Sequence, residues 1–233
     1  MKRNLLLSLL AVMIFVSCQK EITFENADGG TGGGGTGGSS NCKACAYLPW
    51  CDGSVYSYYD TAFGGSATVS ADTIQFVKDT TFGGRTYQKI VTKGFASTPY
   101  YTNCTNGVSR YTIFDIPATG GTISKIELRM VDANLAVNGT WNDTIRNGLG
   151  QTVIYKNTIK AKAVSRTLHT NTFSDVIHVE SIAGVEVPLL GFLVTNKSDY
   201  YYARGVGLIE ANVANEDGSL VYQHKVIKAY RIP

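Results

Sequence analysis

Apolar and polar residues alternate along much of the chain, which is the pattern of β-strands that bury one face. Ile126, Leu128 and Met130, for example, alternate with Glu127 and Arg129. Segments such as AFGGS, TFGGR, ATGGT and NGLGQ interrupt these stretches and are typical of turns. No window shows a sustained 3.6-residue apolar period with helix caps. The sequence therefore predicts an all-β fold, an antiparallel meander of roughly 10–12 strands curled into a barrel, half-barrel or sandwich.

Two segments of the chain share a longer pattern. TIQFVKDTTFGGRTYQKIV begins at Thr73 and TIKAKAVSRTLHTNTFSDVI begins at Thr158, and each reads as a Thr-Ile strand, a turn and a second strand. A tyrosine strand follows each of them, PYYTNCTNGV from Pro99 and DYYYARGVGL from Asp199. One interpretation is two similar halves with the tyrosine strands in equivalent places of one sheet. The other is that β-meanders of similar composition look alike.

Residues 1–17 have the pattern of a signal peptide. Lys2 and Arg3 precede a run from Leu5 to Val16 that is apolar except for Ser8, and this run is shorter than the roughly 20 residues of a membrane-spanning helix. The run ends in FVSC, which resembles the lipobox of bacterial lipoproteins. That resemblance implies cleavage before Cys18, diacylglycerol on its sulfur and an acylated (typically palmitoylated) amine. The alternative is an ordinary secretory peptide with an incidental cysteine.

Residues 18–41 would carry the lipid and act as a tether. Every residue from Gly29 to Ser40 is Gly, Thr or Ser, a composition that cannot form a core. The tether from Gln19 to Asn41 has a root-mean-square reach of about 25–30 Å. Lys20 followed by Glu21 resembles the signal that sends Bacteroidetes-type lipoproteins to the cell exterior. We therefore expect an outer-membrane protein that faces the exterior, with the periplasmic face as the alternative.

Residues 42–233 are predicted to form one β-rich domain, since β-sandwiches and barrels often reach this size undivided. Lys2 and Arg3 leave with the signal peptide, so the formal charge falls from +3 to about +1. Because the remaining chain is nearly neutral and has no basic tract, we do not expect nucleic-acid binding.

The folded region holds four cysteines, Cys42, Cys45, Cys51 and Cys104. An even number in an exported protein predicts two disulfides, and the sequence does not choose among the three pairings. CKAC could also be a redox pair, although such pairs lie between a strand and a helix. Four thiolates could hold zinc, but a second CxxC is missing. We expect structural disulfides and no metal site.

The segments YLPWCDGSVYSY, GTWNDTI, FSDVIHVE and YYYARGVGLIE together resemble a group of Bacteroidetes-type outer-membrane lipoproteins. Members of this group carry a YYAKGVGLI-like segment near the C-terminus, and this chain has Arg204 where Lys is usual. The resemblance runs from about Cys45 to Glu210. The group is distantly similar to lipoprotein-carrier and lipid-binding half-barrels, so the resemblance implies a curved sheet around an apolar cavity. It supplies no catalytic residues.

Catalytic chemistry is not expected, and neither is a cofactor. No GxSxG context is present, and the three histidines, His169, His178 and His224, are predicted to lie in a turn and two strands rather than in a triad. Paired carboxylates of a hydrolase are a third and weaker hypothesis. Gly205 and Gly207 lack the third glycine and the helix of a phosphate-binding loop, so we expect them to bend a strand.

Tyrosine clusters and Asp-Thr pairs are the remaining candidate features. Tyr101, Tyr201 and Arg204 are candidate ligand contacts, although tyrosine is also simply a good strand residue. Asp-Thr pairs resemble the O-glycosylation pattern of exported Bacteroidetes-type proteins, but they also favour strand ends and turns. The acceptors would be Thr61, Thr73, Thr80 and Thr144.

These observations predict a lipid-anchored protein of the cell envelope that binds an apolar or carbohydrate ligand and does not catalyse a reaction. The alternative is a structural or accessory subunit that docks on another envelope protein. An apolar concave pocket would favour ligand binding, whereas a filled interior with an exposed apolar patch would favour docking.

Overall fold

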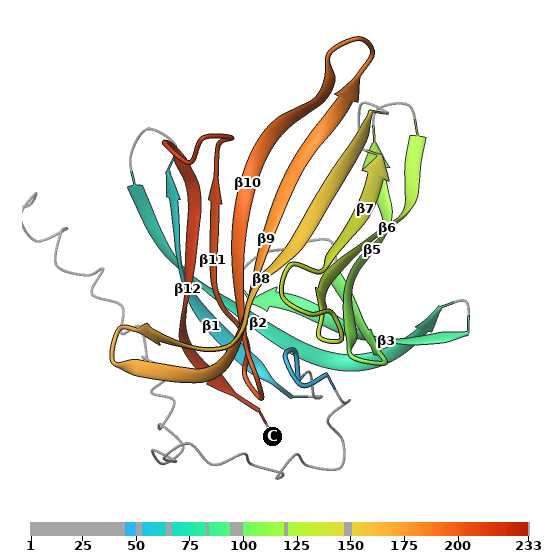
Figure 1. Cartoon of the computed structure of the whole chain (residues 1–233). Helices are drawn as coiled ribbons and strands as arrows, with labels where there is room; N and C mark the ends of the chain where they lie inside the picture. The colour runs from blue at the N-terminus through green and yellow to red at the C-terminus, as the bar shows by residue number, and fades with distance from the viewer. Residues whose placement is uncertain are drawn as a thin grey trace, which may run out of the picture. The chain divides into compact units, whose positions relative to one another are not determined.

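The structure is a computed structural model that describes residues 45–49, 53–63, 67–82, 84–93, 100–118, 121–146 and 151–232. Within these ranges the chain forms twelve strands in a single antiparallel sheet (Figure 1), which confirms the predicted all-β meander. None of the described residues forms a helix long and apolar enough to cross a membrane. The strands are β1 (Val55–Phe63), β2 (Ala67–Phe82), β3 (Arg85–Lys93), β4 (Tyr100–Thr105), β5 (Val108–Ala118), β6 (Gly121–Asp132), β7 (Thr140–Arg146), β8 (Thr152–Leu168), β9 (Asn171–Val187), β10 (Gly191–Ala203), β11 (Gly207–Ala214) and β12 (Val221–Arg231).

The sheet curls into a nearly closed barrel in the order β6-β5-β4-β3-β2-β1-β12-β11-β10-β9-β8-β7. Its two edge strands, β6 and β7, meet at a seam that side chains bridge. The Trp141 indole Nε1 donates to the Arg129 carbonyl oxygen at 3.2 Å, and the Arg129 amide donates to Asp143 Oδ2 at 3.0 Å. Burial raises the pKa of Asp143, although the Arg129 amide and charge oppose this. The seam thus satisfies backbone groups that an open edge would expose.

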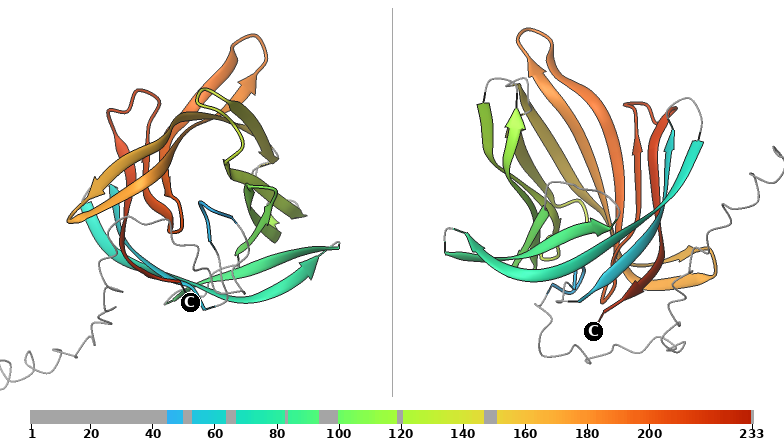
Figure 2. Two further views of the ribbon diagram at one scale, coloured as in Figure 1. Left: turned by 60° about the horizontal axis from the view of Figure 1, so that its bottom comes forward. Right: turned by 180° about the vertical axis from the view of Figure 1, so that it is seen from behind.

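Two hairpins bend away from the barrel and fold over its outer face. The first arm, residues 79–88 of β2 and β3, places the Phe82 ring 5.2 Å from Tyr101 in β4 and 4.4 Å from Phe114 in β5. The second arm, residues 164–176 of β8 and β9, crosses several strands to bring His169 within 5.8 Å of Tyr59 in β1. Figure 2 shows the two arms extending to opposite sides of the barrel.

Register shifts produce the bends of the arms. The pairing of β2 with β3 shifts between Phe76 and Lys78, and that of β8 with β9 shifts three times between Ile159 and Arg166. Ala163 and Asp175 have φ angles of 55° and 52°, which bend the second arm as bulges do. In the strand order, β4 lies beside β3 and β10 lies beside β9. The registers of the two pairs differ, since Tyr101 pairs with Lys89 and Tyr201 with His178, so the two similar halves stay a prediction.

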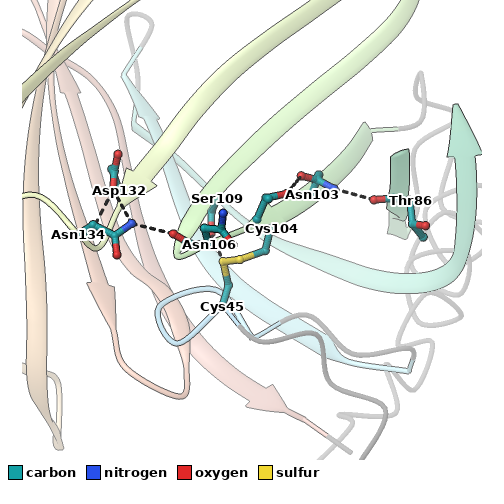
Figure 3. Close-up of a disulfide and its surroundings, with 9 residues drawn as sticks. Cys45, Thr86, Asn103, Cys104, Asn106, Ser109, Asp132 and Asn134 are labelled. Atoms are coloured by element: carbon teal, nitrogen blue, oxygen red, sulfur yellow. Dashed lines mark hydrogen bonds between the residues drawn. A yellow bond between two sulfur atoms is a disulfide. The ribbon is translucent and has the colours of Figure 1, made fainter. Parts of the chain in front are cut away.

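The plug, residues 45–49, closes one end of the barrel. Cys45, Tyr47 and Leu48 are buried and pack against Tyr202 and Trp141 in one core cluster. Cys45 forms a disulfide with Cys104 in β4 (Figure 3). The plug therefore joins the barrel both covalently and by apolar packing.

Candidate functional site

A cavity of about 590 Å³ lies inside the barrel, with Leu48 of the plug in its wall. Cavities of this size are typical of small-molecule sites. The lining is mostly aliphatic and aromatic, and it comes from both halves of the sheet as well as from the plug. The lining residues are Leu48, Tyr56, Tyr58, Ile74, Phe76, Ile90, Thr92, Tyr100, Tyr111, Met130, Tyr202, Gly207, Leu208 and Lys225.

The two-residue period of the strands determines which residues face the cavity. In β2, Ile74 and Phe76 line it and Gln75 lies between them on the other face. Ile74 pairs directly with Thr92 of β3, so their side chains are neighbours on the cavity wall. The same alternation directs Tyr100 of β4 and Tyr202 of β10 inward.

Three of the cavity tyrosines, Tyr56, Tyr58 and Tyr202, are neutral and contribute mainly apolar surface. The Tyr56 hydroxyl donates to the Pro49 carbonyl oxygen at 3.2 Å, and the Tyr58 hydroxyl donates to the Leu208 carbonyl oxygen at 3.0 Å. Burial raises the pKa of Tyr56, Tyr58 and Tyr202, so these phenols keep their protons at physiological pH. Their rings contribute apolar surface, while two of the hydroxyls already bond to the backbone.

One charged group stands in this apolar wall. The Lys225 ammonium lies 3.0 Å from Asp60 Oδ2 and 5.6 Å from the centre of the Tyr58 ring. Gln223 donates to both carboxylate oxygens of Asp60, at 2.9 and 2.7 Å. The paired charges present a nearly neutral polar spot rather than a strong anion-binding site.

A second, smaller cavity of about 50 Å³ lies at the seam between β6 and β7. It shares Met130 and Tyr202 with the main cavity, and its other walls are more polar, with Arg129, Asp143 and Asn157 among them. The barrel interior therefore passes from an apolar main space to a small polar recess at the seam.

The three predicted ligand contacts are not among the residues that line either cavity. Tyr101 lies on the outer face, where Phe82 and Phe114 surround it. Tyr201 also lies outside, because its neighbour Tyr202 points inward. The sequence identified the correct strands, but the inward residues are Tyr100 and Tyr202. We therefore do not include Tyr101, Tyr201 and Arg204 in the proposed site.

Tyr201 belongs to a polar cluster that fastens the second arm to the barrel. His178 stacks on its ring at 4.4 Å, with Nε2 2.7 Å from Asp199 Oδ1. The guanidinium of Arg166 in the arm lies over the same ring at 3.7 Å and pairs with Glu210 of β11. The His178 hydrogen bond lowers the pKa of Asp199. His178 is thus a cross-strand histidine, in agreement with its predicted role.

Arg204 fastens the plug. It lies in the turn between β10 and β11, pairs with Asp175, and donates to the Tyr47 hydroxyl at 3.0 Å. The Tyr47 hydroxyl in turn donates to Asp175 Oδ1 at 2.7 Å. The next residue, Gly205, donates its amide to the Ala46 carbonyl oxygen at 2.6 Å. The ARGVG segment therefore holds the closed end of the barrel.

The prediction that Gly205 and Gly207 bend a continuous strand is wrong: Gly205 lies in the turn between β10 and β11, and Gly207 is the first residue of β11. Their φ angles are 74° and 116°, in the region that favours glycine. A Cβ at Gly205 would meet nothing within 4 Å, and one at Gly207 would make ordinary contacts with Leu48 and Tyr56. The positive φ rather than crowding calls for glycine here.

Some of the other predicted sites lie among the described residues and some lie outside them. Cys45 and Cys104 form one disulfide, whereas Cys18, Cys42 and Cys51 lie outside the described residues. Thr144 is exposed, and the other glycosylation candidates, Thr61, Thr73 and Thr80, are half-buried in strands. Their glycosylation stays a prediction. Across the described ranges, no group of three His, Cys, Asp or Glu side chains is placed to hold a metal ion.

The fold and cavity define a class of protein, an antiparallel barrel that encloses an apolar space. Two solved structures are similar to it. One, from Parabacteroides distasonis and provisionally described as a lipoprotein, is 14% identical with a TM-score of 0.51. The other, from Bacteroides fragilis and provisionally described as an exported protein with a YmcC-like fold, is 8% identical with a TM-score of 0.50.

Both comparisons cover 81% of this chain and 100% of the other chain. Identities this low show a shared fold and nothing further. No family model and no curated protein matches the chain.

Proposed function

We propose that this chain is an exported, lipid-anchored protein of the cell envelope whose barrel binds an apolar ligand without catalysis. The observation that supports this most strongly is the 590 Å³ cavity with its aliphatic and aromatic wall. Each methylene of a ligand that leaves water for such a wall contributes about 0.8 kcal/mol. An acyl chain or another extended apolar group fits this chemistry.

The cavity favours an apolar ligand over a carbohydrate. A sugar needs many hydrogen-bonding partners in its site, because each unpaired hydroxyl would lose its bonds to water. The hydroxyls of Tyr56 and Tyr58 already donate to the backbone, and Asp60 is occupied by Lys225 and Gln223. The same pairing of Asp60 disfavours a role for it as a hydrolytic acid.

Export and anchoring rest on the sequence and agree with the comparisons. The signal pattern of residues 1–17 and the FVSC segment at Cys18 support a lipoprotein. The two proteins of similar fold are provisionally described as a lipoprotein and an exported protein. We place the barrel at the outer membrane, where the Lys20-Glu21 pair favours the exterior face.

The test is mass spectrometry of small molecules extracted from protein purified out of its native membrane. A reproducible lipid or another apolar compound, present in stoichiometric amount, would support the proposal. A co-purifying glycan would redirect it to carbohydrate. An empty barrel that arrives with a stoichiometric protein partner would instead favour the docking subunit, and would count against ligand binding.

A further inference from the structure

The hairpin between β9 and β10 projects beyond the rim of the barrel. The pairing of β8 with β9 extends only to Val185, and β11 pairs with β10 only from Lys197 onward. Residues 186–196, here called the tip, therefore have no strand beside them except each other. Six residues of β10, 191 to 196, carry the tip about 20 Å past the end of β11 at about 3.4 Å per residue (Figure 1).

The tip is strongly apolar, and three of its leucines are exposed. Leu189 is 106% exposed, Leu190 71% and Leu193 43%. The next turn on the same rim, between β11 and β12, exposes Leu220 by 50% and Tyr222 by 42%. Isolated exposed leucines are ordinary, but several on one projecting hairpin mark an interaction site.

The backbone of the tip indicates that the residue in its turn is there because it is apolar and not because it suits the turn. Leu189 has a φ of 71°, a conformation that glycine adopts without strain and leucine adopts at a cost. A large apolar side chain therefore occupies a position where the turn itself would favour glycine. Burial of this side chain against another surface would offset the cost of the strained backbone.

The shape of the tip fits a lipid bilayer better than a protein surface. Successive side chains of a hairpin point to opposite faces, so a protein partner would need a groove that encloses the tip, whereas hydrocarbon surrounds it from every side. At the base, the Lys156 ammonium lies 3.6 Å from the centre of the Phe192 ring. An aromatic ring beside a lysine is typical of the interface between hydrocarbon and water. Glu186 at the same level is exposed and can stay in water.

The length of the chain before the barrel permits this contact. The tip and the plug lie at opposite ends of the barrel, and the chain joins the plug at Cys45. Fully extended, the 27 residue steps from Cys18 to Cys45 span about 90 Å. The thirteen residues of β10 span only about 45 Å. A lipid on Cys18 would therefore leave the tip able to reach the same membrane.

We propose that Leu189 and Leu190 insert into the hydrocarbon of a lipid bilayer, with Phe192, Leu193 and Lys156 at its polar interface. This gives the barrel a second contact with the membrane besides its lipid anchor. The inference rests on the tip and on the proposed lipid anchor at Cys18, but it stands or falls independently of the cavity and its ligand.

Fluorescence quenching by brominated lipid tests the insertion. The full lipidated chain carrying Leu190→Trp is reconstituted in phosphatidylcholine vesicles with and without brominated acyl chains, and the emission of the unsubstituted protein is subtracted. The matched control is Val137→Trp, at a 47% exposed residue in the turn between β6 and β7 at the plug end. We expect the tryptophan at 190 to lose most of its emission and the one at 137 to lose little.

Four results would overturn the proposal. Equal quenching at both positions would mean that the whole barrel lies on the bilayer, and quenching at neither would mean that the tip stays in water. A blue-shifted but unquenched emission at 190 would place the tip against protein. A second variant, Leu189→Asp in the Leu190→Trp chain, should abolish the quenching because a carboxylate resists entry into hydrocarbon. If quenching persisted there, residue 190 would reach the hydrocarbon without Leu189, which would contradict insertion of the tip.

Discussion

Replacing Cys104 by alanine should lower the free energy of unfolding by about 4 kcal/mol. The disulfide joins residues 59 positions apart, and the loss of loop-closure entropy for a loop of that length gives about 4 kcal/mol at 25 °C. The plug adds to the expected loss, because Cys45 and Leu48 are buried beside this bond and would no longer be tethered to β4.

Urea unfolding of oxidised protein, followed by tryptophan fluorescence, measures this change if both variants unfold in one cooperative step. Cys42→Ala is the control, because it leaves the Cys45–Cys104 bond in place. A loss below about 1 kcal/mol, or a non-reduced peptide map that lacks the Cys45–Cys104 link, would refute the reasoning.

Four further substitutions test other parts of the fold. Gly184→Ala should lower the free energy of unfolding by about 2 kcal/mol or more, because its new methyl group would clash with the backbone and ring of the neighbouring strand. Gly191→Ala has open space for the methyl group but a φ of 77°, so the same urea assay should show a loss of about 1 kcal/mol. Trp141→Phe should cost about 1 kcal/mol by removing the indole donor at the seam, and an unchanged urea midpoint would argue against a side-chain-bridged seam. Arg204→Ala should lower the free energy of unfolding by about 1 kcal/mol at neutral pH, since the ion pair with Asp175 is partly exposed. The difference from wild type should shrink on acidification. A pH-independent difference would contradict the ion pair.

The direction of that pH dependence follows from the pKa of Asp175. Burial alone would raise this pKa, but the hydrogen bonds from Tyr47 and Arg204 and the charge of Arg204 outweigh it, so the folded-state pKa is lowered. A carboxyl group with a lowered pKa stabilises the fold above its ordinary, unfolded value. That contribution is lost as the pH falls through the lowered folded value. Thermal melts between neutral and strongly acidic pH measure the loss.

The alternation of residues was sufficient to predict the strands and the meander, because each strand buries one face. It could not say which face of a tyrosine strand points inward. The pairing of β10 with β11 shifts between Tyr201 and Tyr202, and such shifts depend on contacts with neighbouring strands rather than on the local sequence. The cysteine pairing was open for a similar reason, since β4 and the plug meet only in the folded barrel.

The two arms could not be predicted either. The second arm bends at positive φ angles of Ala163 and Asp175, a conformation for which alanine carries no signal and aspartate only a weak one. The bends become stable only when the arms find partners on the outer face, such as Glu210 for Arg166. The glycines at 205 and 207 did indicate an unusual backbone, but the sequence predicted a bent strand where the structure has a turn between β10 and β11.

Native mass spectrometry of the protein with N-phenyl-1-naphthylamine, a neutral apolar probe, tests the central claim most directly. The matched pair of variants uses two adjacent positions on β2 and β3. Ile74→Trp with Thr92→Trp fills the cavity from two paired positions, whereas Gln75→Trp with Val91→Trp adds the same rings to the outer face of the same strands. We predict that one probe binds to wild type and to the outer-face variant, and that none binds to the cavity variant. Equal binding by all three proteins would contradict a ligand site inside the barrel.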